Sequence, residues 1–395
     1  MTPVLHIAVA GCGPAGLAAA LLLHRDGHRV TLFERFDTPR PIGSGLMIQP
    51  TGQAVLAAVG LGDALADAGV RIDRLFGMAG RRVVLDMRYA ALAGGRHGIA
   101  LHRAALFALL HDAVAAAVIP IRTANDVIGS EITGPRRVLK LRDRPDSPAF
   151  DLVIDALGSR SPLASATGRA LAYGALWATV PWAAGFSGDA LEQRYRAASV
   201  MAGVLPVGTP PGFTTPQATL FWSLRADRLD AWRAAGLDAW KAQVRALWPP
   251  TAPLLDAIVD ADQLTFARYA HRTLSSPTQP ALAHIGDAWH STSPQLGQGA
   301  NMALLDAWAL AKAVRESDGV PAALDRFRAL RQRHIRLYQG LSRLLTPVYQ
   351  SDGRVIPWLR DWAVGPLSRS WPVPQLQGAL VSGLVGDPLG RLGLA

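Results

Sequence analysis

A glycine-rich turn near the start of the chain constrains its fold more than any other feature. The turn has the spacing G-x-G-x-x-G and is formed by Gly11, Gly13 and Gly16. The apolar run 5–10 before it predicts a buried parallel strand, and the run 17–24 after it predicts a helix that Gly27 ends. Residues 29–34 predict a second strand. Together these segments predict a βαβ unit of a doubly wound α/β domain.

The chemistry of this turn suits a dinucleotide. The first glycine permits the tight turn, the second lets backbone N–H groups approach a pyrophosphate, and the third lets helix and strand pack closely. The helix opens at Pro14, where a missing N–H is tolerated, and its N-terminus carries partial positive charge. Glu34 ends the second predicted strand, 23 residues after Gly11, where a carboxylate can accept hydrogen bonds from ribose hydroxyls. Cys12, inside the turn, is interpreted as a small packing residue.

A second pattern lies about three-quarters of the way along the chain. Residues 285–307 read IGDAWHSTSPQLGQGANMALLDA, which predicts a strand, a Gly-Asp pair, a glycine-rich loop and a long helix. Gly286 permits close backbone approach, and Asp287 can hold a polyol hydroxyl. The loop opens the helix with free N–H groups that can stabilise negative charge on a reduced flavin ring. One dinucleotide turn alone does not choose between NAD and FAD; this second pattern favours FAD.

The two patterns together resemble the class A flavoprotein monooxygenases with the para-hydroxybenzoate hydroxylase fold. The resemblance rests on GCGPAG with Glu34 and on GDAWHSTSPQLGQGANMALLDA, and it extends to PIGSGLMIQPTGQAVLAAVGLGDAL at 41–65 and LHRAALFALL at 101–110. It implies an α/β fold: a Rossmann-like FAD-binding domain with an inserted, mostly antiparallel β-sheet substrate domain and C-terminal helices.

This organisation divides the chain into six segments. Six Trp residues and a Pro/Gly-rich loop at 205–217 mark the inserted part, which also predicts a helix near 229–247. After residue 351 the mixture of Pro, Gly, Trp and Arg predicts irregular helices and a frayed end. The FAD-binding domain is expected at 1–75, 98–168 and 272–345, the substrate domain at 76–97 and 169–271, and a C-terminal helical tail at 346–395.

The resemblance also implies which residues meet FAD. The turn holds the pyrophosphate and Glu34 the adenosine ribose, Arg103 lies on the phosphate or ribityl side, and Val127 meets the adenine through its backbone. Asp287 binds the ribityl chain, Pro294 and 297–301 lie along the isoalloxazine, and 43–46 form the loop where the flavin ring can swing. His290 and Gln298 are expected to make local loop hydrogen bonds. The full expected FAD-binding set is Gly11, Gly13, Pro14, Ala15, Gly16, Glu34, Arg35, Gly45, Leu46, Arg103, Val127, Gly286, Asp287, Pro294, Gly297, Gly299, Ala300 and Asn301.

Two positions depart from the family pattern. The family has Ala-Asp-Gly followed by a Ser where this chain reads ALGSRS at 156–161, so Leu157 replaces an acid linked to FAD and nicotinamide use. Leu cannot accept a hydrogen bond, so that role is lost or has moved to Asp155. Trp289 stands where the family has Ala, which predicts a narrower, more aromatic cavity beside the flavin.

The implied activity is hydroxylation of an aromatic or polyketide-like small molecule with NADH or NADPH and O₂, through a flavin C4a-hydroperoxide. The cofactor supplies the chemistry, so no nucleophile or metal ligand is required, and no metal site is expected. No catalytic residue is identified. Candidates for a base that activates a phenolic substrate are Asp155, Arg194, Tyr195 and His271.

Two other functions remain open on the residues alone. One is a same-fold flavin oxidoreductase or halogenase reduced by a separate partner, which the Leu157 departure favours. However, WATVPW at 177–182 does not match the W-x-W-x-I-P stretch of such halogenases, and only three Lys are present. The other is a non-enzymatic, membrane-associated protein that uses the Trp/Pro/Arg-rich residues after Trp358, although they follow no clean amphipathic stripe.

Composition narrows the remaining classes. The net charge of +10 comes from scattered residues, 37 of the 40 basic ones being Arg, so no nucleic-acid partner is expected. One Cys excludes an internal disulfide framework and suits a reducing cytoplasm. The apolar run 7–23 is interrupted by Gly and Pro, and no export signal or membrane span is predicted. We therefore expect a cytoplasmic enzyme, monomeric or homodimeric, with membrane contact disfavoured.

Overall fold

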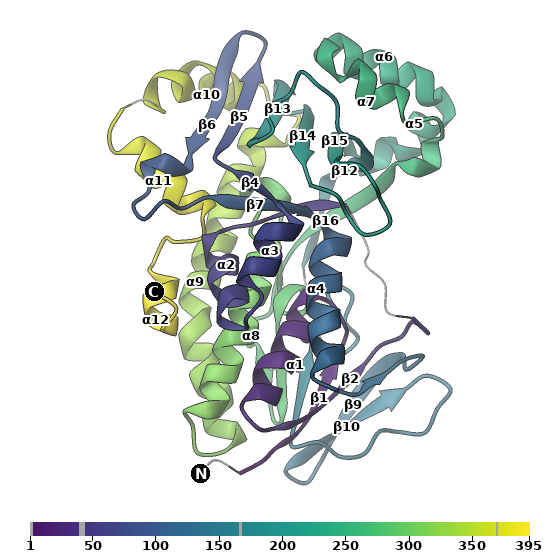
Figure 1. Cartoon of the computed structure of the whole chain (residues 1–395), viewed down its shortest axis with the longest axis vertical. Coiled ribbons are helices and arrows are strands. Elements are labelled where there is room, and N and C mark those ends of the chain that lie inside the picture. Colours follow the sequence, from purple (N-terminus) through teal and green to yellow (C-terminus); the bar gives the residue numbers. More distant parts are fainter. Residues whose placement is uncertain (1–2, 39–43, 166–167, 369) are drawn as a thin grey trace.

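Two sheets stacked along the long axis of the molecule form the computed structural model, which describes residues 3–38, 44–165, 168–368 and 370–395. A six-stranded sheet with its helices occupies the half that holds the N-terminus, and an eight-stranded sheet occupies the other half (Figure 1). The long helix α9 (Val320–Tyr349) runs beside both halves. The predicted α/β fold with an inserted antiparallel sheet is confirmed.

The six-stranded sheet contains the predicted βαβ unit. Its order is β17-β18-β11-β1-β2-β8, and all neighbouring pairs are parallel except β17 with β18. The strands and the first helix are β1 (His6–Ala10), α1 (Pro14–Arg25), β2 (Arg29–Phe33), β8 (Ile121–Arg122), β11 (Leu152–Asp155), β17 (Thr278–Gln279) and β18 (Leu282–His284). Nearly every residue of β1 and β11 is buried, as continuous apolar runs predict for parallel strands covered on both faces.

Helices pack on this sheet and form the main core. Alanines of α1 and α8 are fully buried between the two helices, which allows their close approach. Besides α1 and α9, the helices of this half are α2 (Pro50–Ala58), α3 (Gly62–Ala68), α4 (Arg103–Ala116) and α8 (Gly299–Arg315).

The eight-stranded sheet is mostly antiparallel. Its order is β19-β16-β12-β15-β14-β13-β5-β6. The strands are β5 (Arg74–Ala79), β6 (Arg82–Arg88), β12 (Arg169–Pro181), β13 (Ala190–Arg196), β14 (Val200–Pro206), β15 (Gln217–Arg225), β16 (Thr265–Thr273) and β19 (His290–Ser291). Helices α5 (Leu229–Ala235), α6 (Leu237–Leu247) and α7 (Ala252–Asp256) cover one face, where a separate apolar core forms around Trp222, Trp240 and Trp248.

Two small sheets complete the architecture. One has the order β3-β7-β4, with β3 (Gly45–Ile48), β4 (Val70–Ile72) and β7 (Gly98–His102), and it lies between the two halves. The other is the hairpin of β9 (Val127–Thr133) and β10 (Arg136–Leu141), beside β2.

Two local expectations were wrong. The helix predicted near 229–247 is broken into α5 and α6 by Gly236, whose φ of +83° a helix cannot contain. The chain after residue 351 forms α10 (Val355–Leu367), α11 (Val373–Val381) and α12 (Pro388–Leu392), and its end is not frayed. Leu389 and Leu392 are buried, and the Trp308 indole N–H donates to the Leu392 carbonyl at 2.9 Å.

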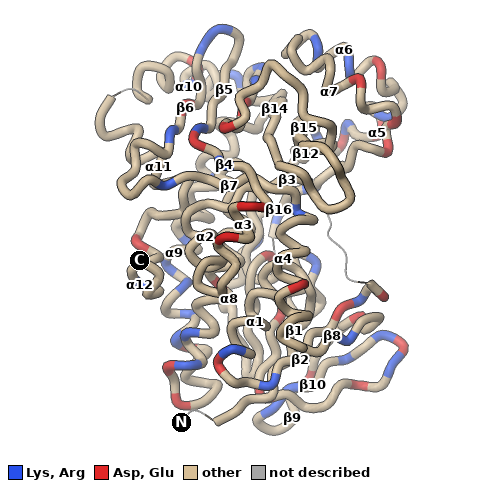
Figure 2. The backbone as a smooth tube through the Cα atoms, viewed as in Figure 1, with Lys and Arg blue, Asp and Glu red and all other residues tan. Residues whose placement is uncertain are grey.

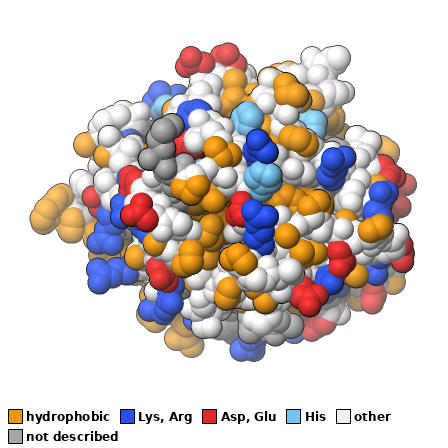
Figure 3. Space-filling view, turned by 90° about the horizontal axis from the view of Figure 1, so that it is seen from below, with side chains coloured by type: hydrophobic (Ala, Val, Ile, Leu, Met, Phe, Trp, Pro, Cys, Tyr) orange, Lys and Arg blue, Asp and Glu red, His pale blue; other side chains and the backbone are white. Residues whose placement is uncertain are grey.

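Surface charge is distributed over the whole molecule. Lys and Arg lie among Asp and Glu along the chain (Figure 2), and the face seen in Figure 3 mixes basic, acidic and apolar side chains. Among the described helices, none is both long and apolar enough to cross a bilayer.

Candidate active site

Glycine suits each of the three positions of the first turn for a different structural reason. Gly11 has a φ of +105°, and a Cβ there would lie 2.6 Å from the Ala156 carbonyl oxygen. A Cβ on Gly16 would lie 2.0 Å from the Gly11 carbonyl oxygen. Gly13, by contrast, has an ordinary φ of −73°, and a Cβ there would meet nothing within 4 Å. The protein itself therefore requires Gly11 and Gly16, whereas Gly13 keeps an open space clear in front of α1.

Glu34 lies beside this open space. Its carboxylate accepts hydrogen bonds from the Cys12 and Phe36 backbone N–H groups, each at 3.1 Å, and so fixes the turn to the end of β2. Burial, and next the Glu34 charge, raise the pKa of the Cys12 thiol to about 12, which suits the predicted packing role of this residue. Arg35 is exposed, with its guanidinium over the Phe36 ring, and Val127 is buried at the start of β9.

The second glycine pattern meets the first in space. Gly286 follows β18 with a φ of +57°, and a Cβ there would lie 3.4 Å from Ala15 on α1 and 3.1 Å from Ala303 on α8. These contacts bring the Gly-Asp pair beside the start of α1. Two turns separated by some 270 residues of sequence thus form one site.

Asp287 is exposed to solvent, whereas its neighbours Gly286 and Ala288 are buried. Enclosure by the surrounding protein nevertheless raises its pKa, against the opposing charges of His290 and Arg103. Arg103, at the start of α4, also acts on Tyr269, whose pKa burial raises to about 12. A carboxylate that lines a recess is expected to be both exposed to solvent and enclosed by protein. Arg103 and Tyr269 lie near the Asp287 carboxylate.

The loop before α8 faces the same region. After the turn Pro294–Leu296, Gly297 adopts a left-handed φ of +61° and lets α8 begin at Gly299. A Cβ on Gly299 would meet nothing within 4 Å, and one on Gly297 would meet only the Gln49 amide nitrogen at 3.9 Å. Ala300 is partly exposed. The unpaired N–H groups at the start of α8 therefore have room for a bound group.

Asn301 and Gly45 play roles that the sequence did not indicate. The Asn301 side chain is buried, accepts from the Gln49 N–H at 2.8 Å, and donates to the Met47 and Gly297 carbonyls at 3.2 and 3.0 Å. The Asn301 side chain therefore fixes β3 to α8. The Gly45 N–H donates to the Thr219 hydroxyl at 3.0 Å, which ties the same strand to β15. Leu46 is partly buried, and residue 43 lies outside the described residues.

A buried ionic cluster holds the Gly-Asp pair in place. Asp306 on α8 accepts from the Gly286 N–H at 2.9 Å, lies 2.7 Å from the His290 ring, and pairs with Arg331 at 2.8 Å. Arg331 is fully buried, and it contacts His334 at 3.0 Å. Burial opposes ionisation of Asp306, but His290 and Arg331 outweigh it and lower the pKa. The expected local role of His290 is thus extended to a cluster that spans α8 and α9.

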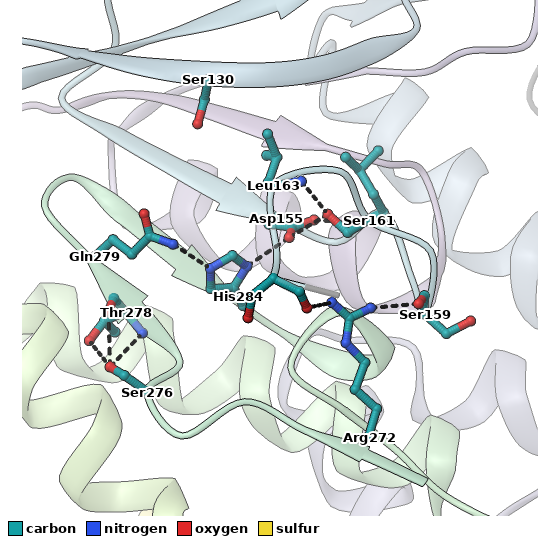
Figure 4. Close-up of polar contacts among 12 residues, drawn as sticks. Ser130, Asp155, Ser159, Ser161, Leu163, Arg272, Ser276, Thr278, Gln279 and His284 are labelled. Atoms are coloured by element: carbon teal, nitrogen blue, oxygen red, sulfur yellow. Dashed lines mark hydrogen bonds and ion pairs between the residues drawn. The ribbon is translucent and has the colours of Figure 1, made fainter. Parts of the chain in front are cut away.

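Asp155 has a structural role. Figure 4 shows its carboxylate between His284 and Ser161, at 2.7 Å from each, and it also accepts from the Leu157 N–H at 3.1 Å. It is fully buried at the end of β11. Its oxygens therefore shape the 156–161 loop. The prediction that Asp155 acts as a base on the substrate was wrong, because its carboxylate is buried and fully engaged.

The other candidate bases lie on strands of the large sheet. The Arg194 guanidinium stacks over the Trp248 ring at 4.5 Å, on the face covered by α5 to α7, so it was wrong as a flavin-side base. Tyr195 is buried near Tyr349 and Arg360, and burial raises its pKa. His271 lies 3.4 Å from the Thr346 hydroxyl, and burial lowers its pKa. Among the described residues, no group of His, Cys, Asp or Glu is placed to hold a metal.

The aromatic cavity expected from Trp289 was wrong. The side chain is 1% exposed and packs against Phe327 in the main core, with ring centroids 5.6 Å apart. It points away from the accessible side of the loop. The expectation of local loop hydrogen bonds was wrong for the Gln298 side chain: its amide donates to the carbonyl of Val381, at the end of the distant helix α11.

An aromatic surface on the large sheet was not predicted. The Trp177 indole N–H donates to the Tyr269 hydroxyl at 3.0 Å, and the Trp177 and Phe221 ring centroids lie 4.7 Å apart. These rings occupy the sheet face opposite α5 to α7, the face that also carries Thr219 against Gly45. The apolar runs of β12 and β15 show no strict alternation, so the sequence did not separate a second functional face from the face that packs under the helices.

Comparison with known proteins agrees with this geometry. The family described as "FAD binding domain" matches residues 2–338. The chain is 25% identical to 3-amino-4-hydroxybenzoate 2-monooxygenase of Streptomyces cremeus, over 88% of this chain and 89% of that protein. It is 26% identical to 6-hydroxynicotinate 3-monooxygenase of Pseudomonas fluorescens, over 79% of this chain and 83% of that protein.

Solved structures share the whole fold. The Klebsiella pneumoniae protein HpxO, complexed with FAD and uric acid, has a TM-score of 0.79 at 20% identity, covering 97% of this chain and 98% of that chain. The tetrameric form of 2-methyl-3-hydroxypyridine-5-carboxylic acid oxygenase has a TM-score of 0.78 at 20% identity, covering 98% of each chain. With the paired glycine turns, these matches establish that the chain belongs to the FAD-binding-domain family and is a class A FAD-dependent monooxygenase of the para-hydroxybenzoate hydroxylase fold.

Proposed function

We propose that the protein hydroxylates a small aromatic molecule, using NADH or NADPH as the electron donor and O₂ as the oxidant. One observation carries this proposal: the open space at Gly13, the exposed Asp287 and the N-terminus of α8 belong to one region, because Gly286 packs between Ala15 and Ala303. When bound, FAD supplies the transfer of electrons from the nicotinamide to O₂.

The residues of the chain divide the work of holding FAD. The N-terminus of α1 and Gly13 receive the pyrophosphate, and Glu34, Arg35 and the backbone at Val127 surround the adenosine. Asp287 and Arg103 hold the ribityl and phosphate side. Pro294, Gly297, Gly299 and Ala300 border the flavin ring, where the helix N-terminus stabilises its negative charge.

The aromatic surface of the large sheet favours an aromatic substrate. Trp177 and Tyr269 are partly exposed on the side of the sheet that Arg103 approaches, and the buried Phe221 ring packs against Trp177. Relatives of the chain are named as enzymes of hydroxylated benzoates and of a hydroxynicotinate, which are aromatic molecules of this kind. We infer that the substrate lies between these rings and the flavin, a place from which the reaction requires water to be excluded.

The loop at 156–161 offers no free acid for a nicotinamide coenzyme. Leu157 cannot replace the acid of the family pattern, and Asp155 is committed to His284 and Ser161. We propose that groups other than Leu157 and Asp155 hold the nicotinamide coenzyme. We also propose that the enzyme works in the cytoplasm, which supplies this coenzyme. The halogenase alternative lacks a lysine at the site: Lys140 pairs with Asp146, Lys312 pairs with Glu316, and Lys241 lies on α6.

The test begins with the visible spectrum of the purified protein, which should show bound oxidised flavin. NADH and NADPH oxidation is then measured across a library of aromatic acids, phenols and heteroaromatics, with product mass as the readout. A mass increase of one oxygen atom supports the proposal. Colourless protein that does not take up FAD would contradict it, and so would a flavoprotein that oxidises NAD(P)H with every compound yet yields only peroxide.

A further inference from the structure

Helix α10 exposes its apolar side and buries its charged side. Its inward positions follow helical spacing and include the buried Arg360 and its partner Asp361. Its outward positions follow the same spacing on the opposite side. The outward set, named here the α10 face, is Val355, Ile356, Trp358, Leu359 and Trp362, and each of these is exposed. This arrangement reverses that of an ordinary surface helix.

Polar contacts fix the orientation of α10. Arg360 is 4% exposed, and its guanidinium donates to the Val348 and Ala197 carbonyls at 2.9 Å each. It also lies over the rings of Tyr195 and Tyr349, at 5.0 and 5.4 Å. These bonds fix the inward side to the large sheet, so rotating α10 to bury its apolar face would expose unpaired groups. The apolar exposure is therefore built into the fold.

Positive charge flanks the α10 face. Arg81 and Arg82 lie at the β5–β6 turn, and Arg354 precedes α10; all three are exposed. The Arg82 guanidinium lies 3.9 Å from the centre of the Trp362 ring. None of the three has an ion-pair partner within the described ranges 3–38, 44–165, 168–368 and 370–395. Figure 2 shows the blue β5–β6 turn at the end of the molecule, next to α10.

The neighbouring acidic groups do not offset this charge. Asp352 pairs with Arg225, Asp361 with Arg360, and Asp86 with Arg74. An exposed apolar helix face that carries two Trp residues and is flanked by Arg side chains without ion-pair partners in the described ranges matches the headgroup region of an anionic bilayer. Trp rings partition to that region, and guanidinium groups pair with phosphates.

We propose that the α10 face docks the enzyme on the surface of an anionic lipid bilayer, without spanning it. A second copy of the chain fits less well, because a two-fold contact would bring this positive rim against its own copy. Trp371, which follows α10 in the sequence, is a further exposed Trp, at 83% exposure. The proposal is independent of the substrate and of the reaction.

Vesicle co-sedimentation of the FAD-loaded protein tests this docking. Vesicles of phosphatidylcholine with 30% phosphatidylglycerol, a composition of roughly physiological charge, are compared with phosphatidylcholine alone. We expect binding to the anionic vesicles that weakens as salt rises. The W358S/W362S double variant and the R81E/R82E double variant should each lose roughly tenfold in affinity. Val4→Ser changes an exposed apolar position near the N-terminus, which lies at the other end of the molecule from α10 in Figure 1, and this variant should bind like the parent protein.

FAD content and the circular dichroism of each variant establish that it is folded before binding is compared. The proposal is overturned if the parent protein stays in solution with anionic vesicles at low salt, or if the two double variants bind as well as Val4→Ser. It is also overturned in favour of self-association if W358S/W362S converts a dimer into a monomer on a sizing column. Because no turnover is measured, these outcomes stand apart from those of the hydroxylation assay.

Discussion

At the scale of single residues, the glycines of the first turn fall into two groups: those that the fold itself requires, and one that leaves space for a ligand. Gly11 and Gly16 approach backbone atoms that leave no room for a side chain, whereas Gly13 faces open space with an ordinary backbone conformation. A side chain at Gly13 is therefore compatible with the folded chain but not with a pyrophosphate lying against the turn.

Replacing Gly13 with Val tests this difference. We expect FAD binding to weaken by about 2 kcal/mol, roughly thirtyfold in Kd, because the new methyl groups occupy the ligand's space. Gly188→Val is the matched control, since a Cβ there also meets nothing within 4 Å and the position lies on another loop. Equilibrium titration with FAD measures both. Equal affinities in the two variants would show that Gly13 does not face the cofactor.

Tyr269 offers a second test at this scale. Its hydroxyl accepts from Trp177 and lies in the field of Arg103, and its pKa of about 12 keeps it protonated at neutral pH, so it can donate to a substrate. We expect Tyr269→Phe to retain FAD and to lower kcat/KM for the preferred substrate about tenfold, the loss of one hydrogen bond. Tyr173→Phe, on the same sheet but bonded to Asp352, is the control. Product assays on both variants measure kcat/KM. Equal values for Tyr269→Phe and Tyr173→Phe would contradict a hydrogen bond from Tyr269 to the substrate.

At the scale of elements, the ionic cluster of Asp306 connects α8 and α9 to the Gly-Asp turn. Removing one buried charge leaves the others unpaired, so Asp306→Asn should destabilise the protein by about 3–5 kcal/mol and reduce FAD retention. The exposed Asp67→Asn is expected to change neither. Urea unfolding with flavin fluorescence follows both properties. If the Asp306→Asn protein is as stable as the parent and retains full FAD content, the cluster does not support the FAD site.

The same cluster predicts a dependence on pH. Burial, and next Arg331, lower the pKa of His334 from 6.5 to about 3 in the folded protein. Below pH 6.5 the unfolded chain binds a proton that the folded chain does not, so this contribution to stability is complete above that pH and falls as the pH falls. Between pH 7 and pH 5 the loss is about 2 kcal/mol. His334→Gln should lower the slope of unfolding free energy against pH, while His24→Gln, on the exposed side of α1, should preserve it.

Prediction from sequence succeeded where the information was local. The turn at 11–16 and the loop at 286–301 each need a backbone conformation that only certain residues allow, so both were visible in the chain. The partners of Asp155, Asn301 and Asp306 come from distant segments, and no spacing indicates them. The prediction of an aromatic cavity at Trp289 was wrong because a departure from the family pattern at one position does not tell whether the side chain faces the core or the ligand. The site's main chain was thus predictable and its supporting side chains were not.

At the scale of the whole molecule, residues 381–383 connect the loops of the site. The Gln298 amide donates to the Val381 carbonyl, the Thr51 hydroxyl to the Ser382 carbonyl at 3.3 Å, and His334 lies 3.0 Å from the Gly383 carbonyl. Three parts of the FAD-binding half therefore depend on one short segment. The sequence suggested irregular structure here because Gly and Pro are frequent, yet burial of Leu389 and Leu392 orders it.

A chain that stops after Ala379 tests this dependence. It lacks all three acceptors and the buried leucines of α12, so we expect a lower unfolding temperature and FAD that is lost on gel filtration. A chain that stops after Gly393 keeps these contacts and should retain the yellow colour. Equal FAD retention in the two truncated chains would show that the segment does not support the site.

The placement of residues 381–383 also sets an order of events in the cell. Every other part of the FAD site precedes them in the sequence, so the ribosome completes the glycine turns, the Asp306 cluster and α8 before the three carbonyls exist. A nascent chain can fold its first βαβ unit early, but it cannot yet brace the loops that retain the flavin. We therefore expect stable retention of FAD to come late in biogenesis, with a pool of colourless, newly made protein preceding the yellow enzyme.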